Sequence, residues 1–222
     1  MMIEGREHFQ KELNKLNDQI LKMGGMVEKA IYNSIEALKK NNPKLAKDVI
    51  LADGQVDSIE LEVDELCLEL LATQQPMAVD LRFITTGMRI GSDLERIGDL
   101  SVDIAQRAAE LAELPLLKPL EDIPKMAELA EAMVHKALDS FVKRDAALAR
   151  TLWQDEEKAD GYRNLVTDEL VDIMSKDAAT TTRALPLILI ARHLERIADH
   201  ATNIAEDVVY MVEGKVIKHG PK

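Results

Sequence analysis

The sequence predicts an all-α protein made of two tandem three-helix bundles that are related by a pseudo-twofold axis. The first observation behind this prediction is the composition, since 46% of the residues are hydrophobic but only 3% are aromatic. The core must then consist of Leu, Ala, Ile, Val and Met, a composition typical of helical rather than strand-rich proteins. The second observation is that apolar residues recur at spacings of three and four. The third is a motif that occurs in both halves of the chain.

Six helical stretches follow from the periodicity and from the residues that interrupt it. Asn41-Asn42-Pro43 ends the first stretch, and Pro43 suits the first turn of the next one. Gly24-Gly25 either bends the first stretch or lets another helix pack closely against it. Pro186 lies early in the last stretch, where it either occupies the first turn or produces a kink. The expected stretches are 3–40, 43–71, 77–113, 124–143, 145–175 and 180–213.

A proline-rich segment between the third and fourth stretches divides the chain. Pro115, Pro119 and Pro124 punctuate it, whereas long helical stretches flank it on both sides. Helices of about 30 residues are roughly 45 Å long, and short turns between them favour antiparallel packing. We therefore expect a first bundle at 1–114, a linker at 115–123 and a second bundle at 124–222. One long six-helix bundle is the alternative.

The two halves share an internal repeat. Residues 94–99 read LERIGD and residues 194–199 read LERIAD, so five of six positions agree at an offset of 100. A weaker match joins the second and fifth stretches at an offset of 103, where Leu45-Ala46 aligns with Leu148-Ala149. Two successive helices thus repeat in the same order, as a duplicated three-helix unit predicts.

Acidic residues form stripes on four of the expected helices. Glu95, Asp99 and Asp103 are four residues apart, and each step of four turns a helix by only about 40°, so they share one face. That face lies opposite the apolar side of the helix and should point outward or into a groove. If the acidic helices of one half are neighbours, their stripes converge. The other stripes are Asp53, Asp57, Glu60 and Asp64 in the first half, and Glu156, Asp160, Glu195, Asp199 and Asn203 in the second.

Such stripes are either a solvated surface or a site for cations. Like charges one helical turn apart destabilise a helix by a few tenths of a kcal/mol per pair, and a hard or borderline cation removes that cost. A ferritin-like di-iron centre is excluded, because no histidine has a Glu three positions before it. His193 and His200 flank the second motif, and as helical surface histidines they are expected to be solvated rather than ligands.

Charge, cysteine content and hydropathy exclude several classes of protein. The net charge is −12, so the chain would be repelled by phosphate backbones and nucleic acid is not an expected ligand. The single cysteine, Cys67, lies in an apolar run and is expected to be a core residue of a protein in a reducing compartment. The sequence contains no run of 18 apolar residues, so no membrane span is expected. The expected location is therefore the cytoplasm. No phosphate-binding loop, nucleophile elbow or other catalytic constellation occurs.

These motifs together resemble the PhoU family, the accessory regulators of bacterial phosphate uptake. The resemblance rests on Met23-Gly24 with Val27-Glu28, on residues 75–82 (QPMAVDLR), and on the doubled motif at 94–99 and 194–199. It covers nearly the entire chain, from about residue 9 to residue 212. The family resemblance implies tandem three-helix bundles and no enzymatic activity.

The resemblance also implies metal binding, because several PhoU proteins hold multinuclear iron or zinc clusters through Glu/Asp-x-x-x-Asp motifs. Divalent cations such as Mg or Mn are further candidates, and no organic cofactor is expected. Asn203 replaces the acid found at the matching position of the first half, so the two sites should not bind equally well. The implied ligands are Asp53 with Asp57, Glu95 with Asp99, Glu156 with Asp160, and Glu195 with Asp199, with Asp103 and Asn203 as extra ligands.

The family's role is negative regulation of phosphate uptake and of the phosphate-starvation response. The implied partners are the sensor histidine kinase and the ATPase subunit of the phosphate ABC transporter, together with a second copy of the chain in a homodimer. The partners would recruit the cytoplasmic protein to the inner face of the membrane. Two alternatives to this adaptor are a metal-dependent helical-bundle enzyme and a metal-free helical scaffold.

Overall fold

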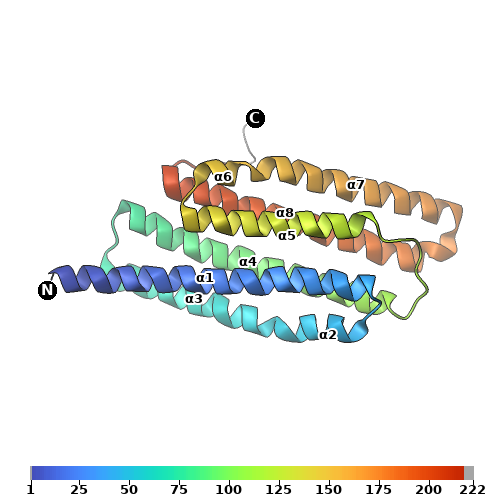
Figure 1. Ribbon diagram of the computed structural model, residues 1–222, viewed down its shortest axis with the longest axis horizontal. Coiled ribbons are helices and arrows are strands. Elements are labelled where there is room, and N and C mark those ends of the chain that lie inside the picture. The colour runs from blue at the N-terminus through green and yellow to red at the C-terminus, as the bar shows by residue number, and fades with distance from the viewer. Residues whose placement is uncertain (1, 218–222) are drawn as a thin grey trace.

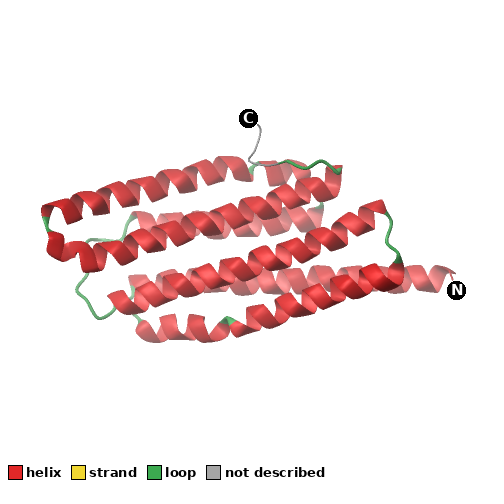
Figure 2. Cartoon of the chain, turned by 180° about the vertical axis from the view of Figure 1, so that it is seen from behind, coloured by secondary structure: helices red, strands yellow, loops and turns green. Residues whose placement is uncertain are grey.

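The computed structural model describes residues 2–217, which fold into helices joined by short connections (Figure 1). Within this part of the chain the cartoon contains helices and loops but no strand (Figure 2). The all-α prediction is therefore confirmed. The helices are α1 (Met2–Lys39), α2 (Pro43–Ala52), α3 (Gly54–Gln74), α4 (Ala78–Leu111), α5 (Asp122–Lys143), α6 (Ala146–Arg150), α7 (Leu152–Lys176), the 3₁₀ helix η1 (Ala178–Thr180) and α8 (Thr181–Glu213).

The same turn follows the first long helix in each half. At the start of α2, the Asn42 side chain accepts a hydrogen bond from the Leu45 backbone N–H at 3.1 Å. At the start of α6, Asp145 accepts from the Leu148 N–H at 2.9 Å. The residues before these caps, Asn41 and Arg144, have positive φ angles of 51° and 50°. The caps and the left-handed residues recur at the offset of 103, so the duplication extends to the turns.

The second and fifth expected stretches are each divided into two helices, which the periodicity did not predict. Asp53 separates α2 from α3, yet its φ and ψ of −59° and −42° are helical. The Val56 N–H bonds to the Asp53 carbonyl at 2.7 Å, so the helix tightens locally to a 3₁₀ pattern. Thr151 separates α6 from α7 with a similar bond from its N–H to the Leu148 carbonyl, at 3.0 Å. Such tightening leaves the apolar faces aligned, so it has no signature in the hydrophobic pattern.

Of the two roles considered for Gly24-Gly25, the structure shows close packing. Helix α1 runs unbroken through both glycines. A methyl group on Gly24 would overlap the Leu138 side chain of α5, whereas one on Gly25 would meet no atom within 4 Å. Pro186 lies inside α8 beyond its first turn, and the helix continues through it. Gly24 therefore sets the distance between α1 and α5.

Each half is a bundle of three long helical rods, and the two halves pack along their length. Helices α1, α2–α3 and α4 form one bundle, and α5, α6–α7 and α8 form the other. Contacts of α4 with α8 and of α1 with α5 join them, so the blue-to-green half lies against the yellow-to-red half in Figure 1.

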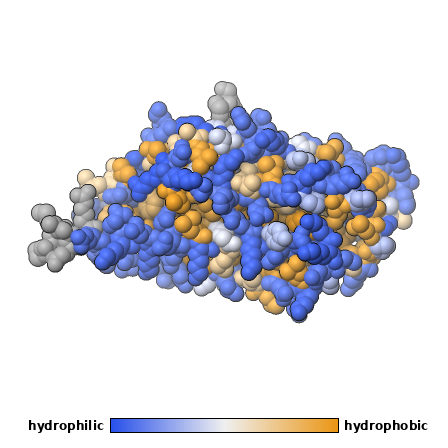
Figure 3. All heavy atoms as spheres, viewed as in Figure 1, coloured by the Kyte–Doolittle hydropathy of each residue, from blue (hydrophilic) through white to orange (hydrophobic). Residues whose placement is uncertain are grey.

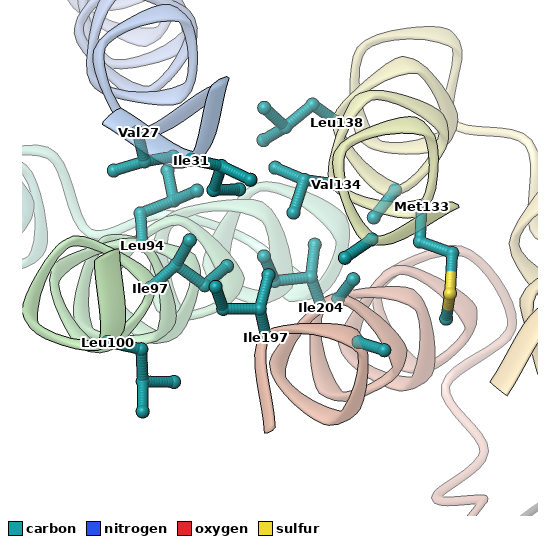
Figure 4. Close-up of a cluster of buried hydrophobic side chains, with 14 of the residues drawn as sticks. Val27, Ile31, Leu94, Ile97, Leu100, Met133, Val134, Leu138, Ile197 and Ile204 are labelled. Atoms are coloured by element: carbon teal, nitrogen blue, oxygen red, sulfur yellow. The ribbon is translucent and has the colours of Figure 1, made fainter. Parts of the chain in front are cut away.

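Buried aliphatic side chains from both halves form one continuous core. Figure 4 shows Val27 and Leu94 of the first half facing Val134 and Ile197 of the second. Cys67 is buried in this core, as expected. The outer surface in Figure 3 is mainly hydrophilic, with apolar atoms emerging between the charged side chains. The division into units 1–114 and 124–222 stays a prediction.

Candidate functional site

The predicted acidic stripes meet in pairs, one pair in each half. In the first half, α3 and α4 bring together what we call the N-terminal acidic cluster. In the second, α7 and α8 bring together the C-terminal acidic cluster. In each cluster, burial and then repulsion from neighbouring acids raise the pKa of several carboxyl groups, so these side chains lie close together. The N-terminal acidic cluster is Asp53, Asp57, Glu60, Glu95 and Asp99, and the C-terminal acidic cluster is Glu156, Asp160, Glu195 and Asp199.

The apolar faces of α4 and α8 explain why these carboxylates point outward. Leu94, Ile97 and Ile104 of α4 are fully buried, and their equivalents in α8 are buried as well. The acids between them must therefore lie along the edges of the bundle. The Glu95 side chain is 24% exposed and the Asp99 side chain 45% exposed, so the cluster lies half inside the surface.

The electrostatics of both clusters are unfavourable in the absence of a cation. Burial, followed by repulsion from Asp57 and Asp99, raises the pKa of Asp53 to about 6. Burial also raises the pKa of Glu95, with a further contribution from Asp99. In the second half, burial and then the Asp199 charge raise the pKa of Glu156. Partly desolvated like charges of this kind are stabilised by a positive charge among them.

Arginine side chains supply part of that positive charge. Arg96 forms ion pairs with Glu95 at 3.4 Å and with Asp99 at 2.9 Å. In the C-terminal acidic cluster, Arg163 lies 3.5 Å from both Asp160 and Glu195. Arg163 is not among the site residues predicted from the sequence.

A signal for Arg163 was present in the repeat. At the offset of 103, Arg163 corresponds to Glu60 of the first half. The N-terminal acidic cluster thus has a fifth carboxylate where the C-terminal acidic cluster has a guanidinium. The two clusters differ in charge for this reason.

The structure does not place Asp103 and Asn203 in the clusters. Asp103 faces His193 of α8, with 3.8 Å between its Oδ2 and the imidazole Nδ1. Asn203 donates to Asp93 of α4 at 3.5 Å. Each step of four residues turns the stripe by about 40°, so two steps carry these residues toward the boundary between α4 and α8.

The expectation that His193 and His200 are solvated is wrong. Their side chains are only 15% and 18% exposed, because both lie between α4 and α8. The His200 Nδ1 is 2.8 Å from Asp93, and burial lowers the pKa of His193. These histidines belong to the contact between the halves rather than to a free helix surface.

The donors of the clusters suit hard or borderline cations, although their present arrangement is not that of a metal site. Among the described side chains, those of residues 7–217, no group of three or more from His, Cys, Asp or Glu is positioned to hold a metal ion. The donors are carboxylate oxygens, which fit magnesium, manganese or iron. Cys67 adds no thiolate, because burial raises its pKa to about 12. Binding would require Arg96 and Arg163 to move away from the acids that they contact.

Comparison with known proteins gives consistent matches over nearly the full chain. A family model described as "PhoU domain" matches twice, at residues 20–108 and 123–208. A "Phosphate-specific transport system accessory protein PhoU homolog" from Aquifex aeolicus is 40% identical over 209 residues, which cover 94% of this chain and 95% of that protein. The homolog with the same description from Pseudomonas aeruginosa is 37% identical over 214 residues, covering 96% and 88%.

Two solved structures have the same fold. The crystal structure of PhoU from Pseudomonas aeruginosa has a TM-score of 0.90 at 38% identity, and the match covers 93% of this chain and 100% of that one. The crystal structure of the phosphate transport system regulatory protein PhoU from Streptococcus pneumoniae has a TM-score of 0.88 at 28% identity, covering 95% and 99%. These names describe accessory and regulatory proteins, not enzymes. With the family model matching both halves, the chain belongs to the PhoU family.

Proposed function

We propose that this chain is a negative regulator of phosphate uptake and of the phosphate-starvation response. The observation that carries the proposal is the match of the family model to both halves, together with relatives named as accessory proteins of the phosphate-specific transport system. The family is one of accessory and regulatory proteins, so the alternative of a metal-dependent enzyme is set aside. The chain acts as an adaptor between the phosphate ABC transporter and the sensor histidine kinase.

Protein contacts are the route by which such an adaptor works. Among residues 2–217, no helix combines the length and the apolarity needed to cross a membrane. The segment before and within the first turn of α4 carries exposed apolar side chains, with Met77 80%, Val79 53% and Leu81 42% exposed. Large apolar residues exposed together are typical of docking surfaces. We assign this segment to the contact with the kinase or with the transporter's ATPase subunit in the cytoplasm, at the inner face of the membrane.

The two acidic clusters form the metal-binding part of the proposal. A cation at the N-terminal acidic cluster would be held by Asp53, Asp57, Glu95 and Asp99, and one at the C-terminal acidic cluster by the four acids there. Iron or zinc clusters, or single Mg or Mn ions, would neutralise carboxylates that now repel one another. The N-terminal acidic cluster is the more negative of the two, so it should bind more tightly. A homodimer of the chain is part of the same proposal.

The regulatory role is tested by deleting the gene and measuring alkaline phosphatase in phosphate-rich medium. Loss of a negative regulator should raise expression, and the intact chain should restore repression. A Met77→Asp/Leu81→Asp variant should fail to restore it while folding normally, because the two charges oppose an apolar contact. Unchanged phosphatase after the deletion would contradict the regulatory role.

Metal binding is tested by elemental analysis of protein purified without chelators. We expect bound metal in the intact chain and about half or less in a Glu95→Gln/Asp99→Asn variant. Glu65→Gln, an exposed acid of α3 outside the clusters, is the matched control and should retain the full content. Metal-free intact protein that still represses the phosphatase would favour the metal-free scaffold.

A further inference from the structure

The first half contains a pocket that meets the N-terminal acidic cluster only at Asp53. It has a volume of about 360 Å³ and lies between α1 and α2, with residues of α3 and α4 completing it. This volume falls within the range typical of small-molecule sites, roughly 300–1,000 Å³. Its walls are mostly aliphatic. The main apolar lining residues are Met26, Leu45, Val49, Val56 and Val102.

One carboxylate in this pocket has no positive partner. Asp53 lines the pocket, and its side chain makes no capping hydrogen bond to the start of α3. Among residues 7–217, its charged neighbours are the acids Asp57 and Asp99, and its side chain forms no ion pair. The other two charged lining residues, Lys29 and Asp48, are exposed and of opposite sign. The unbalanced charge of the pocket is therefore the half-buried Asp53 carboxylate.

The second half carries charged residues at positions equivalent to part of the pocket lining. Three lining residues of the pocket, Asn33, Ala52 and Gln55, correspond at the offset of 103 to three ion-paired residues of the second half. These are Lys136, Asp155 and Lys158.

The ion-paired group spans the same helices as the pocket. Asp155 is buried, and it binds Lys136 of α5 and, at 2.7 Å, Lys158 of α7. The group thus bridges α5 and α7, as a ligand in the pocket would bridge α1 and α3. The second half thus pairs an acid with lysines at these positions, whereas the first half has the uncharged residues Asn33, Ala52 and Gln55 there.

We propose that this pocket binds an aliphatic ammonium group, with the ammonium against Asp53 and the hydrocarbon chain along the aliphatic walls. A positive charge there would balance the Asp53 carboxylate, which lines the pocket and has only acidic charged neighbours among residues 7–217. The lining contains no aromatic residue, so stacking does not favour a flat ligand. The same chemistry occurs in free alkylamines and in a lysine side chain of a partner protein. The inference does not depend on the proposed regulatory role.

The test compares n-hexylamine with its neutral counterpart n-hexanol by NMR titration of the full chain at neutral pH with EDTA present. We expect the amine to bind about tenfold more tightly, the gain typical of a charge-assisted hydrogen bond. Asp53→Asn should abolish the difference. Asp168→Asn, the matched change at an exposed acid of α7 outside both acidic clusters, should leave it unchanged. Equal affinities for the amine and the alcohol in the intact chain would overturn the proposal.

Exchanging the residues of the two halves gives an independent check. Asn33→Lys/Ala52→Asp/Gln55→Lys should abolish binding of the amine by rebuilding the ion-paired group in the first half. The reverse variant, Lys136→Asn/Asp155→Ala/Lys158→Gln, should add a second site and double the stoichiometry. Circular dichroism checks that each variant is folded. If the first variant does not fold, the stoichiometry of amine binding to the reverse variant tests the proposal instead. Unchanged binding in folded variants contradicts the proposal.

A capped lysine, N-acetyl-lysine methylamide, separates the two sources of the ligand. Binding of both hexylamine and the capped lysine would identify the side chain of a partner as the ligand, since the backbone is then accommodated. Binding of hexylamine alone would identify a free amine. Either result supports the ammonium site, and failure of both probes to bind overturns it.

Discussion

At the scale of single residues, the arginines near the acidic clusters decide how negative each cluster is. Arg96 contacts two acids of the N-terminal acidic cluster, and Arg163 contacts two of the C-terminal acidic cluster. Glu60, which also lies in the first cluster, is replaced by Arg163 in the second. A metal ion must therefore compete with relatively more positive charge in the second half.

Removing Arg163 should strengthen cation binding at the C-terminal acidic cluster. We expect Arg163→Ala to raise the affinity for Mn²⁺ by up to about fivefold, because exposed ion pairs are typically worth up to about 1 kcal/mol. Isothermal titration calorimetry of the chelator-treated protein measures the change. Arg107→Ala, which removes an arginine paired with Glu110 elsewhere on α4, should have little effect. A fall in affinity at the cluster would show that Arg163 helps to hold the site.

Asp53 should make the metal-free protein less stable as the pH rises. Its pKa is raised from 3.8 to about 6 in the folded state, so between these values the native state binds more protons than the unfolded state. Stability then falls as the pH rises through this window. Asp53→Asn should raise the free energy of unfolding by about 1 kcal/mol at pH 7.5, a value reduced by solvent screening, and by little near pH 4.

Urea denaturation at the two pH values measures this effect. Asp168→Asn, an exposed acid of α7, is the control and should give the same small change at both. A gain from Asp53→Asn that is equal at pH 4 and pH 7.5 would mean that ionisation of Asp53 is not its cause.

At the scale of elements, the two adjacent glycines of α1 have different roles. Gly24 lies where a side chain would overlap Leu138 of α5, whereas Gly25 faces open space. Both are equally unfavourable for the helix as an isolated element. A side chain at Gly24 and one at Gly25 should therefore affect stability differently only because of the contact between α1 and α5. The difference in stability measures how tightly these two helices pack.

Alanine at the two positions should therefore have opposite effects. Gly25→Ala should stabilise the protein by about 0.5–1 kcal/mol through helix propensity. Gly24→Ala should be at least about 1 kcal/mol less stable than Gly25→Ala, because Leu138 must move within the core. Thermal denaturation compares the two variants. In a Leu138→Ala background the difference should disappear, and its persistence would place the cause elsewhere.

At the scale of the whole molecule, the two bundles share one core. Helix α4 packs against α8, and His200 and Asp93 join across that contact. Buried aliphatic side chains of both halves belong to one core cluster, and Figure 4 shows some of them meeting between the helices. Two units that share a core of this kind should unfold together.

The single tryptophan, Trp153, makes that expectation testable because it reports on the second half alone. Leu16→Ala, a fully buried residue of α1, should cost about 3 kcal/mol and shift the Trp153 fluorescence transition to lower urea. Leu61→Ala, which changes a residue that is 61% exposed, should leave it in place. A Trp153 transition that is unaffected by Leu16→Ala would show that the two bundles unfold independently.

The sequence by itself determined the helices, the duplication and the outward acidic stripes. Each follows from the spacing of residues along one helix, which the chain order specifies directly. The turns at Asn42 and Asp145 were also marked locally, by residues that break and cap helices.

Only the tertiary structure decided which side chains of different helices meet. The positions of Arg163 beside Glu195 and of His193 beside Asp103 depend on how helices rotate and cross. The same holds for the pocket beside Asp53, whose lining comes from four helices. These features depend on contacts between residues far apart in the chain, and the periodicity of a single helix contains no information about its neighbour's orientation.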